Sequence, residues 1–97
     1  MNTSKEQIEK DCAECGIPDY MVGGIERWVR HGIDPGSFLM SVICNDLFRT
    51  VAHADDTNRN LLFNYCNYFY NFAPSQCFGS NAKATAWEGT ENVAVQS

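Results

Sequence analysis

The sequence has little positive charge. Its 97 residues include seven Lys and Arg against twelve Asp and Glu, which leaves a net charge of −5. Proteins that coat nucleic acid or an anionic membrane surface carry basic surface, so this charge argues against both classes. The chain also has no apolar run near the length of about 18 residues that a membrane-spanning helix needs. The polar stretch at residues 1–7 has no signal-peptide core, and we therefore expect a cytoplasmic protein.

Known catalytic motifs are also missing. The sequence contains no Gly-x-Ser-x-Gly, no phosphate-binding loop, no His-Glu-x-x-His and no paired carboxylates in an apolar setting. Cys44 and His53 lie nine residues apart, at different angles on one predicted helix, so they do not form a ready nucleophile–base pair. We therefore predict that the protein is not an enzyme, has no catalytic residues and uses no cofactor.

Cysteine is not scarce, but its number is odd. The five cysteines are Cys12, Cys15, Cys44, Cys66 and Cys77. An odd count without an export signal favours free thiols over a disulfide framework. Cys12 and Cys15 form a Cys-x-x-Cys, which is a metal or redox motif in other contexts, but no second pair follows at zinc spacing. With Ile8 they fall at i, i+4 and i+7, so we interpret them as small core residues and predict no metal site.

The most apolar stretch is residues 61–72, in which eight of twelve residues are leucine or aromatic. At about 100° per residue, these side chains cover most of the circumference of a helix. Such a helix must be buried on several sides, by its own chain or by a second copy. One line of polar residues interrupts it: Asn60, Asn64, Asn67 and Asn71. Because asparagine is a poor helix former, this line either faces water or hydrogen-bonds a partner helix or polar ligand.

Helical periodicity and capping residues extend over most of the chain. We predict an all-α fold, a small helical bundle of four main helices at residues 4–15, 18–31, 35–53 and 57–73, with a short C-terminal helix near 81–88. The helix at 57–73 is the aromatic-rich central helix. In helix 35–53, the core face is predicted to contain Met40, Ile43, Cys44, Leu47, Phe48 and Val51. Residues 1–89 form one domain in this prediction, and residues 90–97 form a flexible tail.

A concentration of basic residues lies in predicted helix 18–31. Gly23 and Gly24 inside this helix cost about 1 kcal/mol each relative to alanine. Either a second backbone or a ligand approaches closely there, or the face is simply solvated and loosely wound. We predict a ligand-binding surface around these glycines, with one residue from the following helix. Its residues are Tyr20, Arg27, Arg30, His31 and Arg49.

Several short stretches carry a resemblance to a known group of proteins. They are Ile17-Pro18, Gly32 to Leu39, Asn45-Asp46-Leu47, Ala54 to Asn58 and Cys77-Phe78-Gly79-Ser80. Through them, residues 17–87 resemble a group of small uncharacterised proteins encoded by tailed bacteriophages and prophages. The resemblance brings no functional residues with it. It implies an accessory phage protein that works inside a bacterial host cell, and small phage proteins often act by stoichiometric binding.

Two functions are compatible with these expectations. One is an anti-defence protein that sequesters a small anionic nucleotide-type signal in a pocket of an oligomer. The alternative is an inhibitor or modulator that binds a host protein through an acidic or aromatic surface. Neither involves a nucleic acid polymer or a membrane. We also predict a homo-oligomer, most simply a two-fold dimer with Tyr65, Tyr68 and Phe72 at the seam, because one chain of this size has more apolar surface than it can readily hide.

Overall fold

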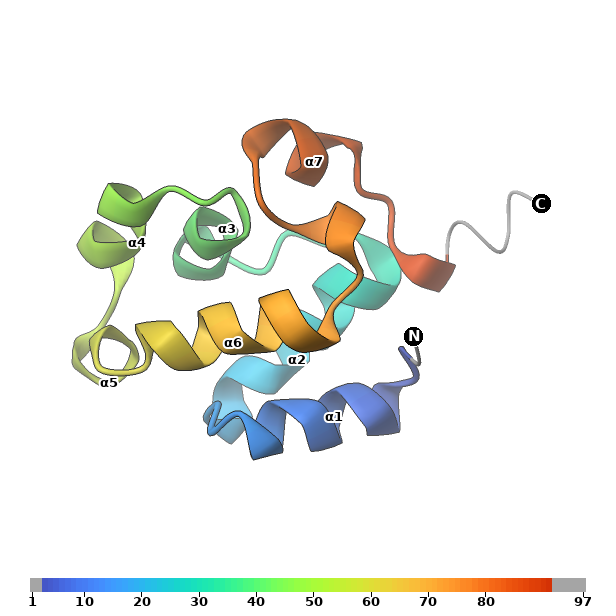
Figure 1. The fold of residues 1–97 in the computed structure, drawn as a ribbon, viewed down its shortest axis with the longest axis horizontal. Coiled ribbons are helices and arrows are strands. Elements are labelled where there is room, and N and C mark those ends of the chain that lie inside the picture. Colours follow the sequence, from blue (N-terminus) through green and yellow to red (C-terminus); the bar gives the residue numbers. More distant parts are fainter. Residues whose placement is uncertain (1–2, 92–97) are drawn as a thin grey trace.

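The computed structural model describes residues 3–91, and over this range the chain is helical without any strand (Figure 1). The all-α prediction is confirmed, but the helices are shorter and more numerous than the predicted four-plus-one arrangement. Their bounds are α1 Lys5–Glu14, α2 Asp19–His31, α3 Ser37–Ile43, α4 Leu47–His53, α5 Asp56–Arg59, α6 Leu62–Phe72 and α7 Asn81–Ala86, with a 3-10 turn η1 at Ser75–Cys77.

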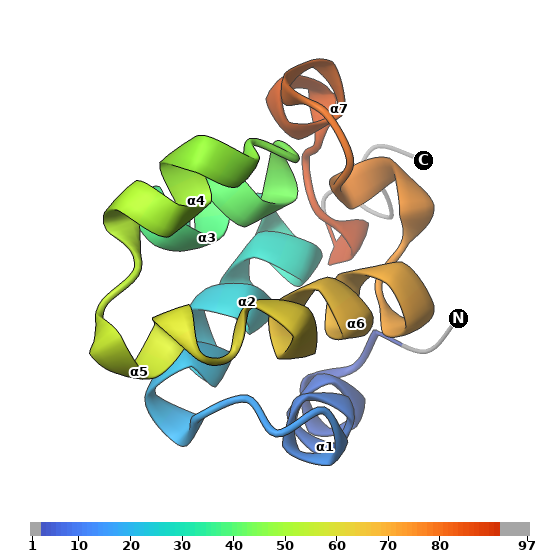
Figure 2. The ribbon, with the colours of Figure 1, turned by 60° about the vertical axis from the view of Figure 1, so that its left-hand side comes forward.

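Helix α6 is the centre of the molecule. It contacts α1 on one side and α3 on another, and α2 crosses behind it (Figures 1 and 2). Tyr65, Tyr68 and Phe69 are at most 2% exposed and form the middle of the core. The ring of Phe38 from α3 meets Tyr65 edge-on at a centroid distance of 5.2 Å. Tyr65 and Tyr68 are thus core residues of a single chain, so the predicted dimer seam through them is wrong.

The line of asparagines is partly a contact between helices. The Nδ2 of Asn64 donates to the carbonyl of Cys15 at 2.9 Å, and the Nδ2 of Asn67 lies 3.7 Å from the Cys15 sulfur. Both amides therefore hold the C-terminal end of α1, where helix carbonyls lack partners. Asn60 and Asn71, at the two ends of the line, are exposed. Asn64 and Asn67 therefore contact a partner helix, as one of the two alternatives predicted. Asn60 and Asn71 face water, as the other alternative predicted.

The predicted helix 35–53 is interrupted at residues 44–46. Asn45 has a φ of 61°, in the left-handed region that asparagine tolerates better than most residues. The amide of Asn45 donates to Val42 and that of Asp46 donates to Ser41, which is the Schellman ending of a helix. Asp46 then caps α4, because its Oδ1 accepts from the Arg49 amide at 3.1 Å. The two short helices consequently fold back on each other as a hairpin (Figure 2).

Two other helix boundaries differ from the predicted ones. Helix α3 begins at Ser37 rather than at residue 35, because Asp34 accepts a hydrogen bond from the Gly36 amide at 2.8 Å in a turn before the helix. The predicted helix 57–73 divides into α5 and α6, with Asn60 and Leu61 between them. The first difference shortens a predicted helix at its start, and the second divides a predicted helix by a turn.

A strap at residues 87–91 crosses the C-terminal end of α2. The indole Nε1 of Trp87 donates to the carbonyl of Trp28 at 2.8 Å, and the Trp28 Nε1 donates to the carbonyl of Cys77 at 3.0 Å. A Cβ on Gly89 would overlap with the backbone of Arg30 and His31, so only glycine fits there. The packed domain thus extends to residue 91, and the remainder of the predicted tail, 92–97, lies outside the described residues.

Candidate functional site

The predicted binding surface on α2 is only partly open. Tyr20 is 64% exposed and Arg27 is also exposed, and residues seven apart lie on the same face of a helix. The Arg27 guanidinium folds back over Gly23, where its Nη1 lies 3.1 Å from the position that a Cβ would occupy. Gly24 lies under the α2–α3 connection, with the Pro35 carbonyl oxygen 3.6 Å from its Cβ position. This is an ordinary van der Waals separation, so the approach of a second backbone does not require glycine at either position.

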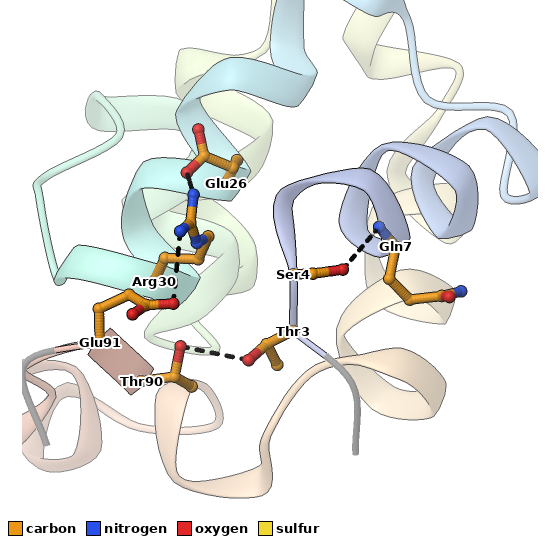
Figure 3. Close-up of polar contacts among 7 residues, drawn as sticks. All are labelled: Thr3, Ser4, Gln7, Glu26, Arg30, Thr90 and Glu91. Atoms are coloured by element: carbon orange, nitrogen blue, oxygen red, sulfur yellow. Dashed lines mark hydrogen bonds and ion pairs between the residues drawn. The ribbon is translucent and has the colours of Figure 1, made fainter. Parts of the chain in front are cut away.

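Arg30 and His31 lie under the strap. The Arg30 guanidinium bonds to Glu26 at 3.1 Å and to Glu91 at 3.3 Å (Figure 3). Desolvation lowers the pKa of Arg30, but the two carboxylates outweigh it and hold this pKa above its ordinary value. The His31 backbone packs against Gly89. Arg30 is therefore already neutralised by its own chain and is poorly placed to receive an anion.

Arg49, the fifth predicted site residue, lies on α4, which packs against α3. The structure places the other four on α2. Of the predicted set, Tyr20 and Arg27 remain as an exposed pair on one helix face, which we name the α2 pair.

Helices α4 and α6 carry most of the large apolar side chains that are exposed among the described residues. Helix α4 exposes Leu47 by 66%, Phe48 by 85% and Val51 by 46%, while α6 exposes Phe63 and Tyr70 by 79% each. Cys66 is exposed on the same stripe of α6, because residues 63, 66 and 70 follow the i, i+3, i+7 spacing of one helix face. We name these exposed side chains of the two helices together the α4–α6 face; its residues are Leu47, Phe48, Val51, Phe63, Cys66 and Tyr70.

The α4–α6 face exists because of the turn at Asn45. In an unbroken helix, as the periodicity predicts, Leu47, Phe48 and Val51 would continue the apolar face that Ile43 presents to the core. The left-handed residue changes the direction of the chain and rotates the following side chains about the helix axis, so these side chains face outward. The prediction that they belong to the core is therefore wrong. The signal that sequence analysis missed is the pair Asn45-Asp46, since asparagine suits a helix ending and aspartate suits a helix start.

Two shallow clefts run along the α4–α6 face. One holds about 220 Å³ and lies between the end of α3 and α6, with Phe78 and Gly79 at its far edge. The other holds about 70 Å³ and lies where Leu47 of α4 approaches Leu62 of α6. Val42, Asn45 and Cys66 border both clefts, so the two are continuous. The clefts connect Leu47 of α4 with Cys66 and Tyr70 of α6.

The charge on the α4–α6 face comes from the α4 side, where Asp46 borders the smaller cleft and Arg49 is exposed. Helix α6, from Leu62 to Phe72, contains no Asp, Glu, Lys or Arg, although the whole chain has a net charge of −5. The acidic residues concentrate on other elements, with Glu6, Glu9 and Glu14 on α1. Depletion of charge with enrichment of aromatic residues is the composition of the buried centre of protein interfaces.

The thiols differ sharply in accessibility. Burial raises the pKa of Cys12 and of Cys77 to about 12, and both side chains are fully buried. Burial also raises the pKa of Cys15 and of Cys44. These four thiols are poor nucleophiles near neutral pH, since the thiolate is the reactive form. Cys66 is the exposed cysteine of the chain and borders the α4–α6 clefts.

Within residues 3–91, no three His, Cys, Asp or Glu side chains gather as a metal-binding group, and no helix has the length and apolarity to cross a membrane. Comparisons with protein-family models, with curated proteins and with solved structures found no match to this chain.

Proposed function

We propose that this protein acts by stoichiometric protein–protein contact rather than by catalysis, and that the α4–α6 face is its contact surface. The observation that carries the proposal is the exposure of three aromatic rings, Phe48 on α4 and Phe63 and Tyr70 on α6, each by 79% or more, on two helices that share a cleft. Leaving such rings in water costs free energy that burial against a partner recovers, at roughly 25 cal/mol per Å². Soluble monomers rarely expose apolar patches beyond a few hundred Å² unless these bind something.

The rigidity of the supporting helices favours the same function. Tyr65 and Phe69 of α6 are buried in the core, so the outward stripe of the same helix is held in place without a partner. Phe69 also packs against Phe78 at the edge of the larger cleft, at a centroid distance of 6.0 Å. A preorganised aromatic surface loses little conformational entropy on binding, and its anchors typically contribute about 2 kcal/mol or more each.

Affinity capture tests the proposal. Wild-type protein, immobilised and exposed to an extract of the cell that makes it, should retain a partner protein in stoichiometric amount. The double variant Phe48→Glu/Tyr70→Glu should lose that partner, because both substitutions place a charge in the contact. Tyr20→Glu is the matched control, an exposed aromatic residue changed to an acid on α2. Capture that is unimpaired in the double variant would contradict the proposal.

A second candidate is the binding of a small anionic, nucleotide-type ligand at the α2 pair. It is supported by the exposed ring of Tyr20 and by the Arg27 guanidinium on the same face, since a base stacks on aromatic rings and a phosphate pairs with Arg. Cyclic and ADP-ribose-type nucleotides should then raise the melting temperature, because a ligand at 100 times its Kd adds about 2.7 kcal/mol. Arg27→Glu should remove the shift. No shift with any nucleotide would reject this candidate.

The cellular setting stays a prediction from the sequence resemblance. In that setting the protein is a phage accessory factor in the cytoplasm of a bacterial host, and the contact with a host protein serves an anti-defence role. Recovery of the partner by affinity capture would identify the process that it modulates.

A further inference from the structure

We propose that the larger cleft, between the end of α3 and α6, binds a small uncharged aromatic compound, and that the side-chain amide of Asn45 is the hydrogen-bonding group that orients it. Both features belong to one site, because Asn45 lines this cleft of about 220 Å³. The inference goes beyond the proposed function and does not depend on it, since the ligand is a small molecule whether or not the surrounding surface also contacts a protein.

The volume of the larger cleft restricts the ligand to about one ring. An apolar cavity of about 150 Å³ in a protein core binds benzene. Sites for drug-sized molecules hold about 300–1,000 Å³. The volume of about 220 Å³ lies between these two values, so a single six-membered ring with one short substituent is the size that fits.

The walls of the larger cleft favour an aromatic ring. Phe69 and Phe78 line it with their centroids 6.0 Å apart and their planes tilted by 45°, and Tyr70 lines it from the outer side of α6. Phe69 is only 2% exposed, so the core holds this wall in place. Offset and edge-on contacts between rings stabilise an aromatic pair beyond the burial of area. A planar aromatic ligand therefore gains more here than an aliphatic one of the same size.

The side chains that line the larger cleft are aliphatic, aromatic or neutral polar, and none is charged. Charges of both signs lie outside it. Asp46 borders the smaller cleft, and the Lys83 ammonium donates to the Ser75 carbonyl at 3.3 Å. A charged ligand would give up water in the larger cleft without gaining a counter-ion there, which costs free energy. The lining thus selects for a neutral ligand.

Asn45 provides an amide at the point where the two clefts meet. It borders both of them, and its side chain is exposed. The turn uses only its backbone, through a φ of 61° and the donation of its amide to Val42. Glycine adopts such a φ without strain, so the turn alone does not require a carboxamide. A carboxamide both donates and accepts, and it can pair with an amide or hydroxyl group on the ligand.

Three probes of one shape and different charge test the selectivity on the full chain: benzamide, benzoate and benzylammonium. Saturation-transfer NMR, observed on the probe, measures the Kd of each. Benzamide should bind several-fold more tightly than either charged probe. Equal binding of all three, or preference for a charged one, would overturn the proposal.

The thiol of Cys66 reports where the probe binds, because Cys66 is exposed and lines the larger cleft. Benzamide at a saturating concentration should slow its reaction with a neutral thiol reagent several-fold. Benzoate at the same concentration should leave the rate as it is in the free protein. An unchanged rate with bound benzamide would place the probe elsewhere and exclude the larger cleft.

Two variants test the residues. Asn45→Gly should weaken benzamide binding several-fold through the lost hydrogen bond, at a nearly unchanged melting temperature. Asn71→Ala is the matched control, since it removes an exposed amide of α6 that does not line the larger cleft, and it should bind as the wild type does. Cys66→Phe should abolish binding, because it fills the larger cleft from an exposed position. Full affinity in Asn45→Gly or in Cys66→Phe would contradict the proposal.

Discussion

The hydroxyl of Tyr65 donates a 2.6 Å hydrogen bond to the Oδ1 of Asn58, and both side chains are buried in the core. This contact ties α5 to α6 across the turn that separates them. Asn58 is otherwise held by Asp55, whose Oδ1 accepts from the Asn58 amide at 2.7 Å. Burial raises the pKa of Tyr65 far above its ordinary value, so the hydroxyl keeps its proton and remains a donor.

Tyr65→Phe should therefore destabilise the fold by about 1–3 kcal/mol, because it leaves a buried amide oxygen without its donor. Urea denaturation followed by circular dichroism measures the change. Tyr70→Phe is the matched control and should leave stability unchanged, since Tyr70 is 79% exposed. Equal stability of the Tyr65→Phe variant and the wild type would show that this bond is not a determinant of the fold.

Gly89→Ala should release the strap from α2. Its φ of +92° is strained for alanine, and the added Cβ would overlap with backbone atoms of Arg30 and His31. Gly36→Ala provides the control, because Gly36 also has a positive φ, +100°, but its Cβ position has no atom within 4 Å. Gly36→Ala should cost about 1–2 kcal/mol from backbone strain alone. Gly89→Ala should cost more and should also change the fluorescence of Trp87; a smaller loss than that of Gly36→Ala would contradict the strap contact.

Stability should fall as the pH rises above the ordinary thiol pKa of 9.0, because burial raises the pKa of Cys12 and of Cys77 to about 12. The folded state keeps protons that the unfolded chain releases in this range, so their contribution is complete below pH 9 and is lost as the pH approaches 12. Each thiol should contribute a slope of about 1 kcal/mol per pH unit.

Denaturation curves on either side of pH 9.0 measure this slope, and Cys77→Ala should reduce it by one thiol. Phe63→Ala, at an exposed position whose side chain does not titrate, is the control and should leave the slope as it is in the wild type. An identical slope in Cys77→Ala and the wild type would mean that Cys77 titrates in the folded protein as it does in the unfolded one.

The turn at Asn45 should be specific to residues that accept a positive φ. Asn45→Ala should destabilise by about 1–2 kcal/mol, because alanine has a Cβ clash in the left-handed region. Asn45→Gly should be within a few tenths of a kcal/mol of the wild type, since glycine adopts this region without strain. Equal losses in both variants would indicate that the side chain of Asn45, rather than its backbone conformation, is required.

The sequence predicted best where a capping residue and an apolar stripe agree. Ser4 caps α1 by accepting from the Gln7 amide at 3.2 Å (Figure 3), at the start of the predicted helix 4–15, and Gly32 ends α2 with a φ of 67°, directly after the predicted helix 18–31. Pro74 lies beyond the end of α6, as its missing amide and fixed φ predict. Local chemistry decides each of these points, so a single sequence contains the necessary information.

The candidate sites were less predictable for two reasons. They depend on the direction in which side chains point around a helix axis, and they depend on contacts between residues distant in sequence. One left-handed residue, Asn45, leaves three predicted core side chains exposed. The spacing of apolar residues alone does not show that the helix ends there and a new one begins in another direction. Arg30 is of a residue type that binds anions, but Glu91, sixty-one positions away in the sequence, neutralises its charge. Nothing in the sequence around Arg30 indicates that Glu91 is its partner.

The strap has a consequence for the order in which the chain acquires its structure. Residues 28–32 leave the ribosome well before residues 87–91, yet the Trp28 carbonyl receives the Trp87 indole across a separation of 59 residues. Such non-local pairing requires closure of a long loop, which slows folding. The C-terminal end of α2 therefore lacks this contact until residues 87–91 have been synthesised. A chain that ends before Trp87 would lack the strap, and the Trp28 carbonyl of α2 would then have no indole donor.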